Sequence, residues 1–198
     1  MTNPLTVIFI GPQGSGKGTQ IGLLRSVLEA TENSAGILEI QTGNLFREFF
    51  AGEKTYSTKK VQEDIVNGEL QPLFLAASLW TELLRKQGDD KKHFLIEGSP
   101  RHLAEAELME GVWQFYRRRE LVVINLDTPE KIILKRMAGR GRADDTAAGI
   151  EKRLAWYREQ TLPVLDFYRT RPATRVIDID GSLNVNEVQH IIIRALNL

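Results

Sequence analysis

The sequence contains no cysteine among its 198 residues, and this absence removes several kinds of site at once. A disulfide framework, a cysteine-ligated zinc or iron–sulfur centre and a thiol nucleophile all need a residue that the chain lacks. The lack of cysteine also fits a reducing compartment. The three histidines, His93, His102 and His190, are scattered and show no spacing typical of a catalytic triad or a metal site, so we interpret them as structural or surface residues.

The chain also lacks an excess of either charge, because 26 Lys and Arg balance 26 Asp and Glu. General binding of nucleic acid or of a membrane surface needs excess positive charge, so we expect neither partner. No apolar run reaches about 18 residues, which argues against a transmembrane helix. The N-terminus has no basic segment before its first apolar run. We therefore expect no signal peptide and a cytoplasmic location.

What the sequence does contain is an alternation of short apolar runs with longer amphipathic segments. Apolar runs typical of buried strands occupy residues 5–10, 37–40, 93–96, 121–126 and 175–179. Helical spacing covers residues 17–28, 59–67, 73–86, 102–116, 129–137, 150–168 and 185–196. Such an alternation indicates βαβ units, and predicts an α/β fold with a five-stranded parallel sheet and helices on both faces.

Two segments interrupt the alternation. Residues 42–72 carry two or three short helices without a strand, and residues 139–149 are rich in Gly, Arg and Asp. Neither segment is long enough to be a separate domain, so we expect a single domain over residues 1–198. Ligands of open α/β folds bind at the carboxyl edge of the sheet, and we expect both segments to lie over that edge.

A phosphate-binding loop is predicted at residues 11–17 (GPQGSGK), which follow the first strand and open a helix. Its glycines free backbone N–H groups to converge on phosphate oxygens, and the helix N-terminus adds a partial positive charge. Lys17 is expected to reach the β- and γ-phosphates. The residues predicted to bind ATP are Gly14, Ser15, Gly16, Lys17, Gly18 and Thr19.

One detail of this loop narrows the class. The residue after the lysine is Gly18 instead of the usual Ser or Thr, and Thr19 follows. The resulting run at residues 16–20 (GKGTQ) resembles the phosphate loop of nucleoside monophosphate kinases of the adenylate kinase family. Residues 42–47 (TGNLFR) are similar to the family's acceptor segment, with Asn44 in place of Asp.

The resemblance continues to about residue 179. Residues 94–101 (FLIEGSPR) resemble the family's Leu-Asp-Gly-Phe-Pro-Arg signature, with Glu97 and Ser99 in place of the Asp and the aromatic residue. Residues 139–145 (GRGRADD) and the later Lys-Arg pair at 152–153 are similar to the family's short lid. The Asp pair of that lid is expected to hold its arginines through salt bridges. The alternative is a cap for the helix from residue 146 onward, and the pair can serve both roles.

The resemblance implies a P-loop NTPase fold with an acceptor-binding insertion at about 42–72 and a lid at about 139–147. It implies that Mg²⁺ accompanies ATP, held by Thr19 and Glu97 directly or through water. The residues that it places in catalysis are Lys17, Arg101, Arg136, Arg142 and Arg153. The residues that it places around the nucleoside monophosphate are Thr42, Arg47, Gly98, Arg101 and Glu105. For Thr42, a purely structural role as a helix cap is the alternative.

The residues that would read the acceptor base depart from the family pattern. Glu105 stands where adenylate kinases carry Gln, and Gln71 stands where Val usually precedes Pro72. A glutamine can donate and accept hydrogen bonds, whereas an ionised glutamate can only accept. Glu105 is therefore either a base-reading residue with altered preference or an exposed helix carboxylate.

The resemblance implies transfer of the ATP γ-phosphoryl group to a nucleoside monophosphate, by default AMP, in a monomeric enzyme. A kinase for CMP, UMP or GMP is the alternative. A nucleotide-binding sensor with weakened turnover is the rival from another class, motivated by Asn44, Glu97, Ser99 and Ile132, the last of which replaces an arginine of the donor site. Against it, the chain keeps Lys17 and all five expected arginines, namely Arg47, Arg101, Arg136, Arg142 and Arg153.

Overall fold

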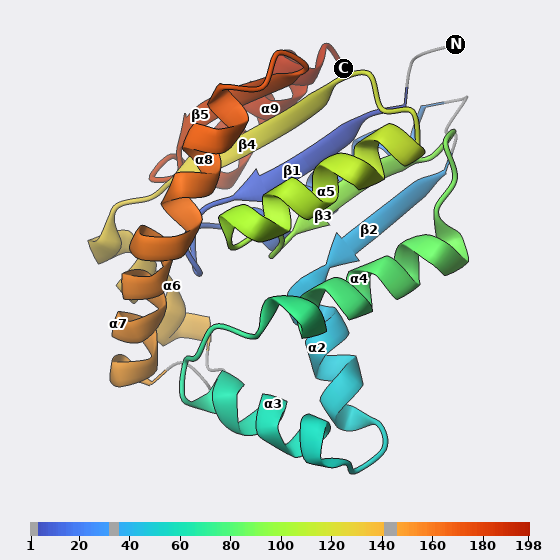
Figure 1. Cartoon of the computed structure of the whole chain (residues 1–198). Helices are drawn as coiled ribbons and strands as arrows, with labels where there is room; N and C mark the ends of the chain where they lie inside the picture. Colours follow the sequence, from blue (N-terminus) through green and yellow to red (C-terminus); the bar gives the residue numbers. More distant parts are fainter. Residues whose placement is uncertain (1–3, 32–35, 141–145) are drawn as a thin grey trace.

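The computed structural model describes residues 4–31, 36–140 and 146–198. These residues form a five-stranded parallel sheet in the order β2-β3-β1-β4-β5, with helices on both faces (Figure 1). The strands are β1 (Thr6–Ile10), β2 (Ile37–Gln41), β3 (His93–Glu97), β4 (Leu121–Asp127) and β5 (Thr174–Asp180). The α/β fold with a five-stranded parallel sheet predicted from the sequence is thus confirmed.

The helices are α1 (Lys17–Glu29), α2 (Thr42–Ala51), α3 (Tyr56–Val66), α4 (Leu73–Gln87), α5 (Leu103–Phe115), α6 (Glu130–Arg140), α7 (Ala147–Trp156), α8 (Leu162–Arg169) and α9 (Val185–Leu196). Among the described residues, no helix is long and apolar enough to cross a membrane. Helix α3 begins three residues before its predicted start, because Thr55 and Thr58 form a reciprocal capping box at its N-terminus.

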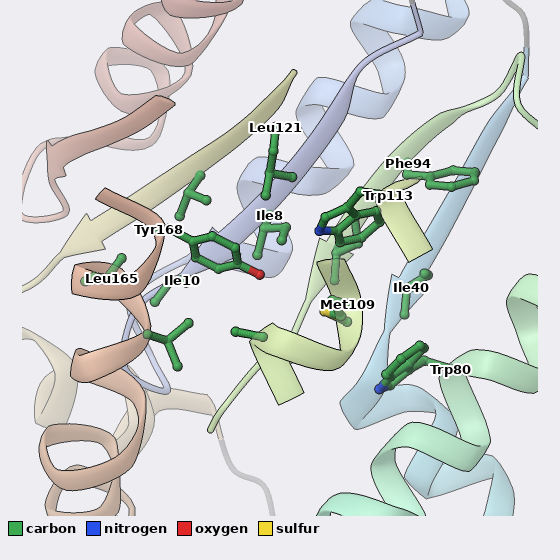
Figure 2. Close-up of a cluster of buried hydrophobic side chains, with 14 of the residues drawn as sticks. Ile8, Ile10, Ile40, Trp80, Phe94, Met109, Trp113, Leu121, Leu165 and Tyr168 are labelled. Carbon is green, nitrogen blue, oxygen red and sulfur yellow. The ribbon is translucent and has the colours of Figure 1, made fainter. Parts of the chain in front are cut away.

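Two hydrophobic layers sandwich the sheet. Helices α4, α5 and α8 cover one face, where Trp80, Met109 and Tyr168 pack against alternate strand residues such as Ile8 and Ile40 (Figure 2). Helices α1 and α9 cover the other face and pack on the remaining alternate residues of the strands. Burying such a side chain contributes about 1.5–3 kcal/mol, so both layers fix the sheet firmly. The rigid sheet then holds the loops at its carboxyl edge in place.

The predicted helix at 150–168 is interrupted in the structure. Between α7 and α8 the backbone forms a π-helical segment, Tyr157–Thr161. The hydroxyl of Thr161 donates to the carbonyl oxygen of Arg101 at 3.1 Å, which ties this segment to the loop after β3. A π turn adds a residue without changing the apolar pattern on either side, and such turns often accompany functional sites.

Candidate active site

One cavity of about 670 Å³ lies at the carboxyl ends of the central strands. The phosphate loop, α2, the loop after β3, α6 and α7 all contribute to its walls. The predicted site residues that line it are Gly14, Ser15, Gly16, Lys17, Gly18, Thr19, Thr42, Arg47, Glu97, Gly98, Arg101, Glu105, Arg136 and Arg153. Arg142 and the lid's Asp pair lie outside the described residues, and Ile132 lies outside the cavity lining.

The phosphate loop is built around left-handed glycines. Gly16 is the N-cap of α1 at a φ of 105°, a conformation that residues with a Cβ rarely adopt. The ammonium of Lys17 donates to the carbonyl oxygens of Gly11 at 2.8 Å and Pro12 at 2.9 Å, so it is held inside the loop. The guanidinium of Arg136 donates to the carbonyl of Ser15 at 3.1 Å, which joins α6 to the same loop. Two cations are therefore fixed beside the helix N-terminus.

Glu97 lies against the first turn of α1. A Cβ built on Gly18 would be 3.3 Å from the Oε2 of Glu97, so a side chain at this position would crowd the carboxylate. Thr19, the next residue, is exposed and lines the same cavity. The glycine after the lysine thus gives room to the longer carboxylate that replaces the family's Asp. Carboxylate and hydroxyl oxygens are hard ligands suited to Mg²⁺.

Arg47 and Arg101 lie on the acceptor side of the cavity. Arg47 donates to the Oδ1 of Asn44, whose amide in turn donates to the Oε1 of Gln41 at 2.6 Å. The Nε of Arg101 donates to the carbonyl of Gly98 at 2.8 Å. Burial lowers the pKa of the Arg101 guanidinium below its ordinary value, and the nearby carboxylates of Glu105 and Glu97 oppose that shift. Arginine nevertheless stays charged, so both side chains can bind a phosphate.

Glu105 anchors a buried hydrogen-bond network under these arginines. Its side chain is 1% exposed, so the alternative of an exposed helix carboxylate is wrong. Its Oε1 accepts from Trp80 Nε1 at 3.1 Å and from Ser99 Oγ at 2.7 Å, and its Oε2 accepts from the Arg101 backbone N–H at 2.7 Å. These bonds occupy three of about four acceptor positions of a carboxylate. The predicted contact between Glu105 and the acceptor base stays a prediction.

Thr42 belongs to the same network. Its hydroxyl donates to Ser99 Oγ at 2.8 Å, and the N-cap of α2 is Gln41, with no side-chain cap. The alternative of a simple helix cap for Thr42 is therefore wrong. The serine that replaces an aromatic residue at position 99 both accepts from Thr42 and donates to Glu105. The exchanges at 99 and 105 are physically coupled, because each supplies the partner of the other.

Helix α7 contacts the acceptor-binding segment directly. Arg153, 6% exposed, donates to the carbonyl of Ile65 at 3.2 Å, and Trp156 Nε1 donates to the carbonyl of Gly68 at 3.0 Å. Lys152 forms an ion pair with Glu69. Gly68 has a φ of 71°, and a Cβ there would be 2.7 Å from the carbonyl oxygen of Gly149. These contacts join the α7 wall of the cavity to its acceptor-binding wall.

At the N-terminus of α7, the cap is Thr146 itself. Its side chain accepts from the backbone N–H of Gly149 at 3.1 Å. The lid's Asp pair was the predicted alternative cap for this helix. Thr146 occupies the N-cap position, and the Asp pair lies outside the described residues.

Trp156 and Gln71 are two of the cavity residues that were not predicted as site residues from the sequence. Trp156 lies under Arg101, whose guanidinium carbon is 5.0 Å from the ring centroid, a cation–π contact. Its spacing of three residues from Arg153 on one helix was a usable signal, since such residues share a face. Gln71 also lines the cavity, and its departure from the family pattern was visible in the sequence without indicating a role.

Comparisons with known proteins agree with this geometry. A model of the family "Adenylate kinase" matches residues 9–173. Adenylate kinase 1 of Nostoc sp. is 35% identical over 93% of this chain and 94% of its own. An adenylate kinase of Corynebacterium urealyticum is 33% identical over 98% and 99%, and one of Stenotrophomonas maltophilia is 33% identical over 97% and 99%. The chain, which carries the phosphate loop and the acceptor arginines in one cavity, belongs to the adenylate kinase family of nucleoside monophosphate kinases.

Proposed function

We propose that this protein transfers the γ-phosphoryl group of ATP to AMP and forms two molecules of ADP. The observation that carries the proposal is the convergence of positive charge on one cavity from separate elements. Lys17, Arg101, Arg136 and Arg153 come from α1, the loop after β3, α6 and α7, and Arg47 comes from α2. This arrangement suits two phosphate chains placed end to end.

The reaction needs no protein nucleophile. An oxygen of the acceptor phosphate attacks the γ-phosphorus in line, and the bond to the β-phosphate oxygen breaks, so that one ADP forms on each side. Arg47 and Arg101 hold the acceptor phosphate, and Lys17 with the phosphate loop holds the donor. Arg136 and Arg153 stabilise the negative charge on the transferring group, because their positions are fixed by bonds to Ser15 and Ile65 before reaction.

Mg²⁺ fits the donor side of this cavity. We propose that Thr19 and Glu97 hold it, directly or through water, together with the ATP phosphates. Among the described residues there is no cluster of three or more metal-ligating side chains, and Mg²⁺ in phosphoryl-transfer sites ordinarily takes one or two protein ligands with waters and phosphates. The ion would offset charge on the phosphates and so assist the transfer.

The domain organisation follows from the same proposal. The chain acts as a single domain over residues 1–198, in which residues 42–72 bind the acceptor and residues 139–147 close over the donor. Contact between α7 and residues 65–69 supports such closure, because it joins the two sides of the cavity. A closed cavity excludes water and protects ATP from hydrolysis. The enzyme acts as a monomer in the cytoplasm. Light scattering in solution tests the oligomeric state, and we expect it to report the mass of one chain.

The test is a coupled assay of ATP with AMP, CMP, UMP and GMP in turn. We expect turnover with AMP at a higher kcat/KM than with the other three monophosphates. Preference for another monophosphate would overturn the choice of AMP. Tight nucleotide binding without turnover of any acceptor would contradict the proposed enzymatic activity. It would favour a nucleotide-binding sensor instead.

A further inference from the structure

The acceptor wall holds a buried amide that the proposed chemistry does not use. Gln71 lies between α3 and α4, lines the cavity and is 7% exposed. Neither its Oε1 nor its Nε2 has a hydrogen-bond partner in the described part of the chain. Gln41, another glutamine of the lining, is bonded at both ends, to Glu39 and to Asn44. A buried polar group without a partner lowers stability, so its presence calls for an explanation.

The surroundings of Gln71 suit a nucleobase. Phe46, Ile65 and Ala76 line the cavity on the same side, and they supply apolar surface for the faces of a ring. Arg47, one residue after Phe46 on α2, marks the end where the acceptor phosphate would bind. Small-molecule sites combine apolar walls with a few polar groups that fix orientation, and Gln71 is a polar residue of this wall.

Glu105, the residue predicted to contact the acceptor base, already has other hydrogen-bond partners. Glu105 accepts three hydrogen bonds from Trp80, Ser99 and Arg101. As a carboxylate it has no donor to offer a ring nitrogen. The edge of adenine that carries the exocyclic amine pairs that donor with a ring-nitrogen acceptor, and a carboxylate satisfies only half of the pair.

We propose that Gln71 reads the amine-bearing edge of the acceptor base, a role that Glu105 has given up to the internal network. The inference rests on the proposed function, since it assigns base specificity within the acceptor site. The amide oxygen accepts from the exocyclic amine, and the amide nitrogen donates to the adjacent ring nitrogen. Binding of AMP thus supplies the two partners that the amide lacks.

The test measures equilibrium binding by calorimetry for two ligands and three proteins. The ligands are AMP and purine riboside 5′-monophosphate, which has the same sugar, phosphate and ring faces but no exocyclic amine. The proteins are the wild type, Gln71→Met and Gln189→Met. Gln189, on α9, is a matched control, because its buried amide is also without a partner among the described residues and lies outside the cavity lining.

We expect Gln71→Met to weaken AMP binding about 10- to 100-fold, the range for a two-bond contact to a base edge. Binding of the purine analogue should weaken about 10-fold less than that of AMP, because it has already lost one of the two bonds. Gln189→Met should leave both affinities unchanged. Both variants should melt at or above the wild-type temperature, since each removes a buried amide without a partner.

Three results would contradict the proposed role of Gln71 or the proposed function on which it rests. Unchanged AMP affinity in Gln71→Met would overturn the assignment. Equal weakening for AMP and the analogue would also overturn it, because a structural role predicts that result. Gln71→Val, which restores the residue typical of the family, gives a second variant with the same expectations if the Met variant does not fold. A wild type that binds neither AMP nor any other nucleoside monophosphate would instead contradict the proposed function.

Discussion

The phosphate-binding residues and the base-recognising residues of the cavity differ in how closely they follow the family pattern. On the donor side, Lys17 and the glycines of the phosphate loop keep the spacing of their motif and take the geometry that it predicts. On the acceptor side the arginines remain, but the residues at positions 71, 99 and 105 differ from the family pattern. Phosphates are gripped by backbone N–H groups and by long cations, which few other residues can imitate. A base is recognised by short polar side chains, and several of these can be replaced together.

The exchange at positions 99 and 105 illustrates the point. A serine offers a hydroxyl that both accepts from Thr42 and donates to Glu105, whereas the phenyl ring of the family's Phe has no such group. The carboxylate in turn holds the backbone of Arg101, a phosphate-binding residue. The acceptor half therefore keeps its phosphate-binding arginines in place through a buried network that differs from the family pattern.

The largest expected effect lies on the donor side, in Lys17→Met. We expect kcat to fall by about 10³-fold or more, because the positive charge that stabilises the transferring phosphoryl group is lost. Initial rates with saturating ATP and AMP measure it. Lys131→Met, which removes an exposed lysine of α6 outside the cavity lining, is the control and should keep the wild-type rate. A loss below about tenfold in Lys17→Met would show that the donor half does not act as described.

Arg153→Ala tests the wall where the two halves meet. We expect kcat to fall by about 10²- to 10³-fold, because a fixed guanidinium is lost beside the transferring group. Arg158→Ala is a matched control, since Arg158 is exposed and pairs with Glu130 away from the cavity. Equal rates for the two variants would argue that α7 only supports the fold.

Glu105→Gln tests the buried acceptor network. An amide has only one accepting oxygen in place of two, so one of the three donors loses its partner. We expect the free energy of unfolding to fall by about 1–3 kcal/mol, measured by urea denaturation. KM for AMP should rise while KM for ATP stays unchanged, because Arg101 is on the acceptor side. An unchanged stability together with an unchanged KM would contradict the network's role.

A double-mutant cycle of Glu105→Gln with Ser99→Ala sharpens this test. If the two residues act as a unit, their effects on stability will be non-additive by at least about 0.5 kcal/mol. Additive effects would mean that the exchanges at the two positions are independent.

The smallest effect is expected outside both halves, at His93. Its Nδ1 accepts from the backbone N–H of Leu5 at 3.0 Å, and burial, with a contribution from Arg118, lowers its pKa below the ordinary value near 6.5. The unfolded chain then binds the proton more readily, so stability falls as the pH drops below about 6.5. Urea denaturation at pH 7 and pH 5 should show a smaller loss for His93→Asn, at unchanged KM values. An identical loss in the variant would contradict this assignment.

The sequence predicted the fold well because its signals were local. Continuous apolar runs marked β1 and β4, and the alternation with helices implied the parallel sheet. The π segment Tyr157–Thr161 escaped prediction, because one added residue in a helix leaves the apolar spacing on either side intact. The phosphate loop was equally readable, since one short segment carries both its motif and its geometry.

The acceptor wall was less readable for a physical reason. Trp80 is 25 residues from Glu105 and Thr42 is 57 residues from Ser99, yet the four side chains form one network. Whether Glu105 was buried or exposed depended on these distant partners and not on its own helix. The missing partners of Gln71 likewise follow from packing in three dimensions, so the sequence showed an unusual residue without showing its state.

Phosphoryl transfer between the two sites is tested most directly with ADP as the sole nucleotide, in the presence of Mg²⁺, by phosphorus NMR. One ADP must then occupy each half of the cavity, so the experiment examines donor and acceptor sites together. We expect ADP to be converted into equal amounts of ATP and AMP without release of inorganic phosphate. ADP that remains unchanged, or that yields AMP and inorganic phosphate, would contradict the account.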